Sequence, residues 1–137
     1  MDERSITKSV RSKLEERGFY IIKHEDHSTI GVPDMSITGN GTTLWVEDKY
    51  FEGSTLKVFL NARKIASKKR YSQLVTLVNL WRKGNATYWI YQNVNGKVMI
   101  GSCTPMDVLR AWSTNSLVKI ENVMELSEWV KEFQMPN

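Results

Sequence analysis

The stretch "GVPDMSITGNGTTLWVEDKY", residues 31–50, is typical of a β-hairpin. Two segments that read as β-strands, 33–38 and 42–50, flank the sequence Gly-Asn-Gly at residues 39–41. A short glycine-rich turn between such segments is a strong local signal for a hairpin. The same stretch places acidic and basic residues within its expected strands, where a plain core strand would carry apolar ones.

These charged residues are expected to meet on one face of the hairpin. Residues two apart in a strand share a face, so Glu47 and Lys49 point to one side and Asp48 points to the other. A hairpin centred near Asn40 brings Asp34 opposite or diagonal to Glu47, close enough for the two carboxylates to share a ligand. Two carboxylates at that separation repel each other unless a cation lies between them.

Magnesium is the cation that suits this arrangement. Mg²⁺ is hard, prefers oxygen ligands and is typically held by one or two carboxylates together with water and substrate phosphate. Lys49 could orient or deprotonate a water on the metal, or stabilise charge that develops on a phosphate. Each fragment alone has a simpler explanation, because Pro-Asp is a turn signal and Glu-x-Lys is common on solvated strand faces. Their combination across a glycine hairpin is far more specific.

The rest of the sequence alternates between helical and strand patterns. The expected elements outside the hairpin are a helix from residue 3 that ends at Gly18, a strand over 19–25, a helix over 61–83, strands over 86–92 and 97–102, a helix over 104–112 and a helix over about 123–133. Residues 50–59 are ambiguous between a loop and an edge strand. This order predicts a single α/β domain over residues 1–137, with a mixed β-sheet flanked by helices and a C-terminal helical extension at 104–137.

Basic residues dominate the middle of the sequence. Residues 53–106 contain nine lysines and arginines and no aspartate or glutamate, although the net charge of the chain is only +4. Such a surface suits a polyanion, because basic side chains release counterions from phosphates and nearby acids would repel them. A solvated basic face without a partner would have the same composition.

Composition also limits the class of protein. No run of about 18 apolar residues is present, so no membrane span is expected. The N-terminal residues lack an apolar signal core, and Cys103 is the single cysteine, so neither export nor a disulfide framework is expected. A cytoplasmic protein fits these features best.

The order of these features resembles the PD-(D/E)xK nuclease superfamily, and within it the small replication and repair nuclease modules called VRR-NUC. The residues that carry the resemblance are Glu3 with Ile6, Gly18, "GVPD" at 31–34, "VEDK" at 46–49, Gln73 and Gly84, in this order over roughly residues 3–92. In the related archaeal-type Holliday junction resolvases the helix glutamate lies about one turn closer to the glycine, where this chain has Thr7 and Lys8. The resemblance implies a restriction-endonuclease-like fold.

The resemblance also implies a metal site. The implied metal ligands are Asp34, Glu47 and the backbone carbonyl of Asp48. The implied catalytic residues are Asp34, Glu47, Lys49, Glu3 and Gln73, with Lys49 as the catalytic lysine and Gln73 as a supporting residue near the site. Mg²⁺ is the expected cofactor, and Mn²⁺ is expected to substitute for it.

A basic cluster next to the candidate site is expected to contact the DNA backbone. Six lysines and arginines fall within residues 57–70, which would supply affinity without reading sequence. The solvated face of a helix is an alternative explanation for Arg63 and Lys64, and an edge-strand charge is one for Lys23. The expected DNA-binding residues are Lys57, Arg63, Lys64, Lys68, Lys69, Arg70 and Lys23.

Together these features predict a Mg²⁺-dependent DNA endonuclease in which a metal-activated water attacks a phosphodiester bond. Branched DNA such as a Holliday junction is the expected substrate by resemblance, and symmetric cutting of two strands calls for a homodimer to which the aromatic C-terminal third contributes. A nicking, flap-processing or restriction-type nuclease and a non-catalytic nucleic-acid binder remain open. The small size suggests a phage or mobile-element origin by association only.

Overall fold

The computed structural model describes residues 2–24 and 31–136 as an α/β fold with two β-sheets and helices on both faces of the larger one. The strands are β1 (Tyr20–Lys23), β2 (Met35–Gly39), β3 (Thr42–Gly53), β4 (Phe59–Asn61), β5 (Asn85–Val94), β6 (Lys97–Cys103), β7 (Leu117–Lys119) and β8 (Glu121–Glu125). The helices are α1 (Glu3–Glu16), α2 (Ala62–Ile65), the 3₁₀ turn η1 (Lys68–Arg70), α3 (Tyr71–Lys83), α4 (Pro105–Ser113) and α5 (Leu126–Glu132). Within the described residues, no helix is both long and apolar enough to cross a membrane.

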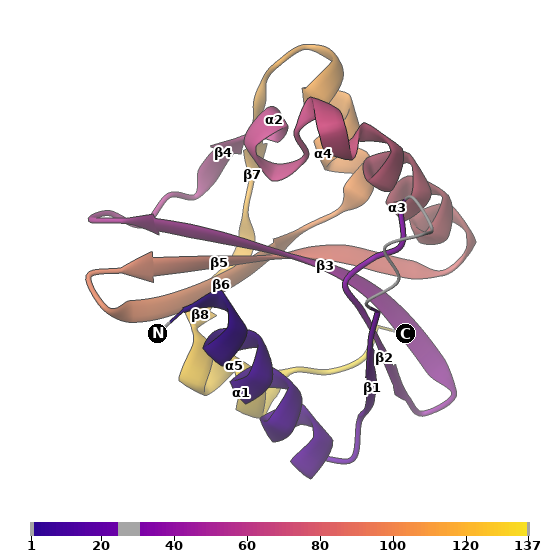
Figure 1. Ribbon diagram of the computed structural model, residues 1–137, viewed down its shortest axis with the longest axis vertical. Helices are drawn as coiled ribbons and strands as arrows, with labels where there is room; N and C mark the ends of the chain where they lie inside the picture. The colour runs from indigo at the N-terminus through magenta and orange to yellow at the C-terminus, as the bar shows by residue number, and fades with distance from the viewer. Residues whose placement is uncertain (1, 25–30, 137) are drawn as a thin grey trace.

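The larger sheet is mixed, as the sequence predicted. Its six strands follow the order β1-β2-β3-β5-β6-β8, with β3 and β5 parallel and the other neighbours antiparallel (Figure 1). The parallel pair requires a crossover, and the chain between β3 and β5 supplies it through β4, α2 and α3. Strand β4 pairs with β7 in a separate two-stranded sheet on the same side as these helices.

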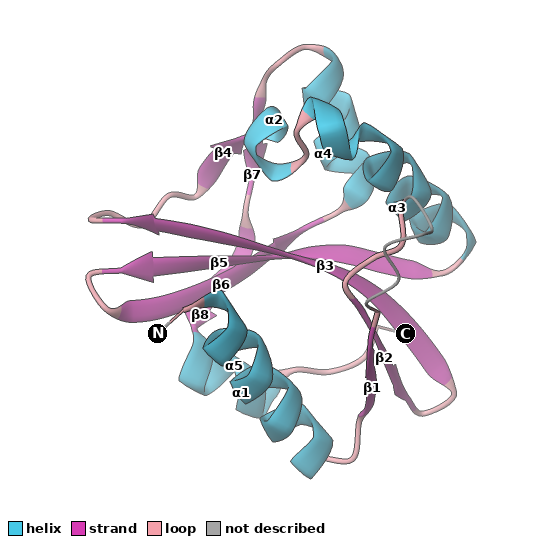
Figure 2. Ribbon diagram, viewed as in Figure 1, coloured by secondary structure: helices cyan, strands magenta, loops and turns pink. Residues whose placement is uncertain are grey.

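Each face of the larger sheet is covered by its own helices. Helices α1 and α5 lie on one face, and α2, α3 and α4 lie on the other (Figure 2). On the first face, Ile6, Val10 and Leu14 form the buried stripe of α1, as their spacing predicted. On the second face, Leu74 and Leu77 of α3 are completely buried. The two hydrophobic clusters together hold the sheet between the helical layers.

The hairpin of β2 and β3 confirms the prediction made from residues 31–50. Asn40 and Gly41 form its two-residue turn, and both have positive φ, 52° and 75°. This backbone corresponds to the turn that matches the twist of hairpin strands and that favours Asn-Gly. The turn sets the register, in which Gly39 lies opposite Thr42 and Met35 lies opposite Val46.

Two segments differ from the sequence-based expectation. The helix expected over 61–83 is divided into α2, η1 and α3, because the backbone is extended at Ala66 and Ser67. The segment 104–137 is not simply a helical extension, since β7 pairs with β4 and β8 joins the larger sheet. Strand β8 covers the edge of β6, whose backbone groups would otherwise be unpaired at that edge.

Candidate active site

The candidate site lies where β2 and β3 separate. The ladder between these strands ends at Met35 and Val46, so the next opposed pair is Asp34 and Glu47. Beyond the end of the ladder, the backbone N–H groups bond to side chains. The Asp34 N–H donates to Glu47 Oε1 at 3.0 Å, and the Asp48 N–H donates to Asp34 Oδ2 at 2.9 Å. The structure therefore brings the two carboxylates together at the fork, as the hairpin register predicted.

The residues before β2 hold Asp34 at this fork. Gly31 has a φ of +91°, and a Cβ at this position would lie 2.6 Å from the Thr76 Oγ1 of α3. Only glycine accommodates both the positive φ and the close approach of the chain to α3 without strain. On the other side, the His24 N–H donates to the Asp34 carbonyl at 2.8 Å. The His24 ring is fixed in turn, because it stacks on Trp45.

Glu47 is a buried carboxyl group between an acid and a base. Its residue is only 3% exposed, and its Oε2 lies 3.4 Å from the Lys49 Nζ. Burial, and next to it the Asp34 carboxylate, raise the pKa of Glu47 from 4.5 to about 7, although Lys49 acts in the opposite direction. Lys49 alone therefore does not balance the two carboxylates, and an additional positive charge at this point would stabilise them.

The side chain and the backbone of Asp48 lie in different surroundings. The side chain points to the α1 face and is buried close to the Tyr91 hydroxyl. This burial, with the nearby Asp34 carboxylate, raises the pKa of the Asp48 carboxyl well above its usual range. Because the N–H and C=O of one strand residue point to the same edge, the Asp48 carbonyl faces the side on which its N–H meets Asp34.

These donors fit a hard divalent cation. Among residues 2–24 and 31–136, no three His, Cys, Asp or Glu side chains form a metal-binding group. The groups at the fork that could hold a cation are the Asp34 and Glu47 carboxylates and the Asp48 carbonyl, with water or phosphate oxygens as its further ligands. That set of oxygen ligands is the one Mg²⁺ accepts, because it usually keeps several waters.

The first turn of α1 forms another wall of the site. The Tyr50 hydroxyl hydrogen-bonds the Thr7 Oγ1, and Thr7 Oγ1 in turn donates to the Glu3 carbonyl at 3.0 Å. Since the Thr7 proton is used in that second bond, Tyr50 is the donor in the first. The Tyr50 ring also stacks on Tyr91, with centroids 4.8 Å apart. These two bonds connect the Glu3 backbone to β3 through Thr7 and Tyr50. They hold the start of α1 beside the cleft that Glu3 lines.

A cleft of about 370 Å³ opens over these groups. Asp34, Glu47, Asp48 and Lys49 line it, together with Glu3. Four cationic side chains also line it, two from α1, one from β1 and one from η1: Arg4, Arg11, Lys23 and Arg70. Positive charge therefore lies on several sides of the carboxylates, which favours the approach of an anion.

Sequence reasoning missed Arg4 and Arg11. They share a face of α1 with Thr7, at the spacing i, i+3 and i+7. A helical projection would have placed them together beside the buried stripe of α1. It would not have shown that this edge of the helix faces β3.

The remaining predicted residues lie outside the cleft. Gln73 is buried in α3 and is not among the residues that line the cleft, and its Oε1 has no hydrogen-bond partner among the described residues. Lys68 and Lys69 are exposed in η1 beside Arg70. Lys57 and Lys64 line a separate hollow of about 290 Å³ at the end of β3.

Arg63 is engaged within the protein. Its guanidinium lies 4.7 Å from the centre of the Trp112 ring, and its Nε and Nη2 each donate to the Trp112 carbonyl at 3.2 Å. These contacts join α2 to α4. Neither the expected DNA contact nor the alternative of a solvated helix face included this packing of Arg63 on Trp112.

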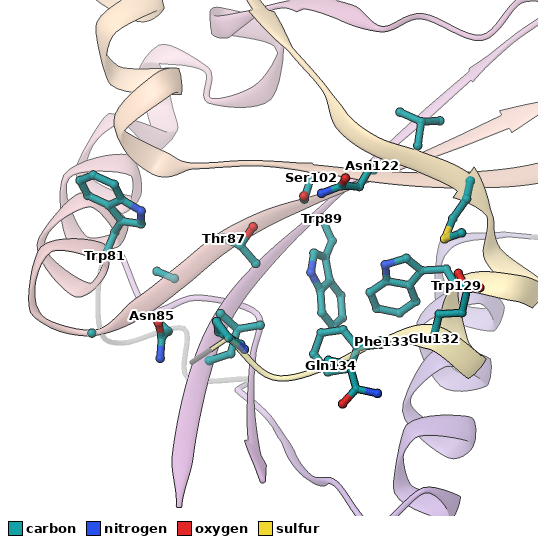
Figure 3. Close-up of a pocket in the computed structure, with 17 residues that line it drawn as sticks. Trp81, Asn85, Thr87, Trp89, Ser102, Asn122, Trp129, Glu132, Phe133 and Gln134 are labelled. Carbon is teal, nitrogen blue, oxygen red and sulfur yellow. The ribbon is translucent and has the colours of Figure 1, made fainter. Parts of the chain in front are cut away.

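A second pocket, of about 690 Å³, lies apart from the cleft, and its lining includes none of the predicted site residues (Figure 3). It lies near the start of β5, and part of its wall is formed by Trp89, which meets the rings of Trp129 and Phe133 edge to face. Among the described residues that line it, only Glu132 is charged. Volume alone therefore does not identify the site, since the titratable groups and the cationic wall belong to the smaller cleft.

Comparisons with known proteins show similarity to solved structures only. No family model matches the sequence, and no curated protein matches it. Among solved structures, the chain is similar to the Holliday junction resolvase Hjc of Archaeoglobus fulgidus, with 18% sequence identity and a TM-score of 0.49. The match covers 96% of this chain and 98% of that chain. At this identity and TM-score, the match does not by itself assign an activity to this chain.

Proposed function

We propose that this protein is a divalent-metal-dependent endonuclease that hydrolyses phosphodiester bonds in DNA. The observation that carries the proposal is the fork between β2 and β3, where Asp34, Glu47 and Lys49 meet in one cleft. The PD-(D/E)xK pattern of the sequence, which these three residues carry, supports the same activity.

The residues have distinct roles in this proposal. Asp34, Glu47 and the Asp48 carbonyl would hold Mg²⁺ or Mn²⁺. The bound cation would supply positive charge to the scissile phosphate and lower the pKa of a water molecule. Lys49 would hold a phosphate oxygen or orient the attacking water, because its amine lies in the same cleft beside Glu47. Glu3 would take part in catalysis from the first turn of α1, and Gln73 would support the site from α3.

The cationic wall of the cleft would bind the DNA backbone. Arg4, Arg11, Lys23 and Arg70 line the cleft, and Lys68 and Lys69 extend the charge beyond it. Contacts of this kind are independent of base sequence and weaken as salt concentration rises. Branched DNA is the proposed substrate, on the strength of the sequence likeness to junction-resolving nucleases, and symmetric cutting of its strands would need two copies of the site.

The test is cleavage of a labelled panel of junction, flap, nicked, duplex and single-stranded DNA with Mg²⁺ or Mn²⁺. We expect cleavage of the branched DNA, and none when a chelator removes the metal. Asp34→Asn should abolish cleavage, and Lys49→Ala should slow it by about 100-fold or more. Lys13→Ala, which removes an exposed lysine of α1 outside the cleft lining, is the matched control and should cleave normally.

The panel also separates the alternatives. Preference for flaps, nicks or plain duplex would assign a different nuclease role to the same site. DNA binding without any cleavage by the wild-type protein would instead favour a non-catalytic binder.

A further inference from the structure

The two-stranded sheet of β4 and β7 exposes one apolar face. Leu60 and Val118, which oppose each other, point inward and join the buried cluster under α2, α3 and α4. The neighbouring side chains point outward, so Phe59 is 51% exposed and Leu117 is 61% exposed. These two residues, with the lysines described next, form what we call the β4–β7 face.

Lysines flank the exposed ring. Lys119 lies directly opposite Phe59 in the ladder, so the two side chains are neighbours on the same face. Lys57, two residues before Phe59, is also exposed. The segment 53–106, which includes Lys57 and Phe59, contains no acidic residue, whereas Asp107 and Glu121 line a hollow beside Leu117 and Lys119. An aromatic ring between cationic side chains is the arrangement with which proteins stack unpaired bases and hold the adjoining phosphates.

Buried side chains hold this face in place. Gln92 of β5 is only 5% exposed, and its amide bonds the backbone of Lys57 twice, with its Oε1 accepting from the N–H at 2.9 Å and its Nε2 donating to the carbonyl at 2.7 Å. Further along, the Ile120 N–H donates to the Val58 carbonyl at 2.8 Å. The exposed ring is therefore presented by a fixed backbone rather than by a free loop.

The β4–β7 face also lies on the path that leads away from the cleft. Strand β3 continues from Lys49 to Gly53, about 13 Å at the usual rise of a strand. The hollow that Lys57 and Lys64 line includes Gly53 in its wall. From Gly53 the chain continues to β4 (Figure 1). A DNA strand that leaves the cleft along β3 would therefore reach the β4–β7 face within a few nucleotides.

We propose that the β4–β7 face binds unpaired bases of the DNA substrate, with Phe59 stacking on a base and Lys57 and Lys119 contacting phosphates. This inference rests on the proposed function and narrows its substrate to DNA with unpaired bases near the cut. A nucleic acid suits the face better than a second protein chain, because lysine is depleted where protein interfaces bury their cores.

The test measures DNA binding without metal, by fluorescence anisotropy, so that it does not depend on cleavage. The ligands are a duplex with an unpaired tail and a fully paired duplex of the same length. Phe59→Leu keeps an apolar side chain but removes the ring, and it should weaken binding of the tailed DNA by about 10-fold. Phe59→Trp should preserve binding. Lys57→Ala and Lys119→Ala should each lower the slope of log affinity against log salt concentration by about one, because each removes one phosphate contact.

The control is Val75→Ala, which shortens an exposed apolar residue on α3 and should change neither affinity. Equal affinities of Phe59→Leu and wild type for the tailed DNA would overturn the inference, as would an equal loss for both DNAs. A change of oligomeric state in Phe59→Leu, measured by sedimentation, would show instead that the face joins two copies of the chain. Failure of the proposed function is distinguishable, because it would appear as absent cleavage with DNA binding intact.

Discussion

At the scale of single residues, Glu47 best shows how the fold changes the chemistry of a side chain. On a solvated strand face, a Glu-x-Lys pair would be an ordinary ion pair worth little to stability. Here the carboxyl is buried and faces Asp34, so Lys49 compensates only part of the cost of its charge. The same burial that destabilises the ionised group without metal would favour cation binding.

Glu47→Gln should change how the stability of the metal-free protein depends on pH. Because the pKa of Glu47 is raised from 4.5 to about 7 in the folded state, the folded protein binds more protons than the unfolded chain between these values. Its stabilising contribution is complete below pH 4.5 and is lost as the pH rises to about 7, by up to about 3 kcal/mol. Urea unfolding in the presence of a chelator at pH 5 to 8 measures this loss.

The glutamine variant cannot ionise at this position, so we expect a smaller loss of unfolding free energy over the same pH range. Asp48 should account for part of the slope that remains, since its pKa is also raised by burial. Mg²⁺ should restore stability to the wild type at pH 7.5 and not to Glu47→Gln. Identical pH slopes in the two proteins would contradict this assignment.

At the scale of elements, the site depends on contacts that join separate parts of the chain. The hydroxyl of Tyr50 connects β3 to α1 through Thr7 and so fixes the turn that carries Glu3 and Arg4. At the opposite edge of the sheet, β8 pairs with β6, and the chain lies close to Gly101 there. Each contact predicts a local effect of a single substitution.

Tyr50→Phe should loosen the first turn of α1. The variant keeps the ring that stacks on Tyr91 but removes the hydroxyl donor, at a cost of about 1 kcal/mol. Hydrogen exchange should therefore speed up in α1 near residues 5–8, and cleavage should slow without loss of the metal ligands. Tyr20→Phe, on an exposed tyrosine of β1, is the control and should leave both unchanged. Unaltered exchange in Tyr50→Phe would argue against a role for this bond.

Gly101→Ala should destabilise the edge of the sheet. A Cβ at Gly101 would lie 2.5 Å from Ile120 Cγ2 and 2.9 Å from Val123 Cγ2, so β8 would have to shift. Overpacking of this kind costs about 1–3 kcal/mol, which thermal or urea unfolding would measure. Gly53→Ala is the control, because the nearest atom to its added Cβ is 3.9 Å away. Equal stability of the two variants would show that β8 adjusts without strain.

At the scale of the whole molecule, the expected homodimer remains a prediction. Symmetric cutting of a branched DNA would require two cleavage sites, and the described chain forms one such site at the fork of β2 and β3. The C-terminal aromatic residues are partly used within the fold, because Trp129 and Phe133 pack against Trp89. A dimer interface would therefore need other exposed groups from this third of the chain.

Sedimentation of the protein on a junction substrate tests this prediction. We expect two copies of the protein bound to each junction. If the β4–β7 face contacts DNA, the Phe59→Leu variant should bind with the same number of copies per junction. One copy per junction, in the presence of cleavage of both strands, would contradict the dimer and would require sequential cutting.

By itself, the sequence determined the hairpin, the helical stripe of α1, the mixed α/β class and the meeting of Asp34 with Glu47. These features follow from turn chemistry and from the periods of strands and helices, which act over a few neighbouring residues. Only the tertiary structure decided that Arg4 and Arg11 line the cleft, that Arg63 packs on Trp112, and that β8 joins the sheet. Those outcomes depend on contacts between segments far apart in the chain, where the burial of apolar faces and the pairing of strand edges outweigh local preference.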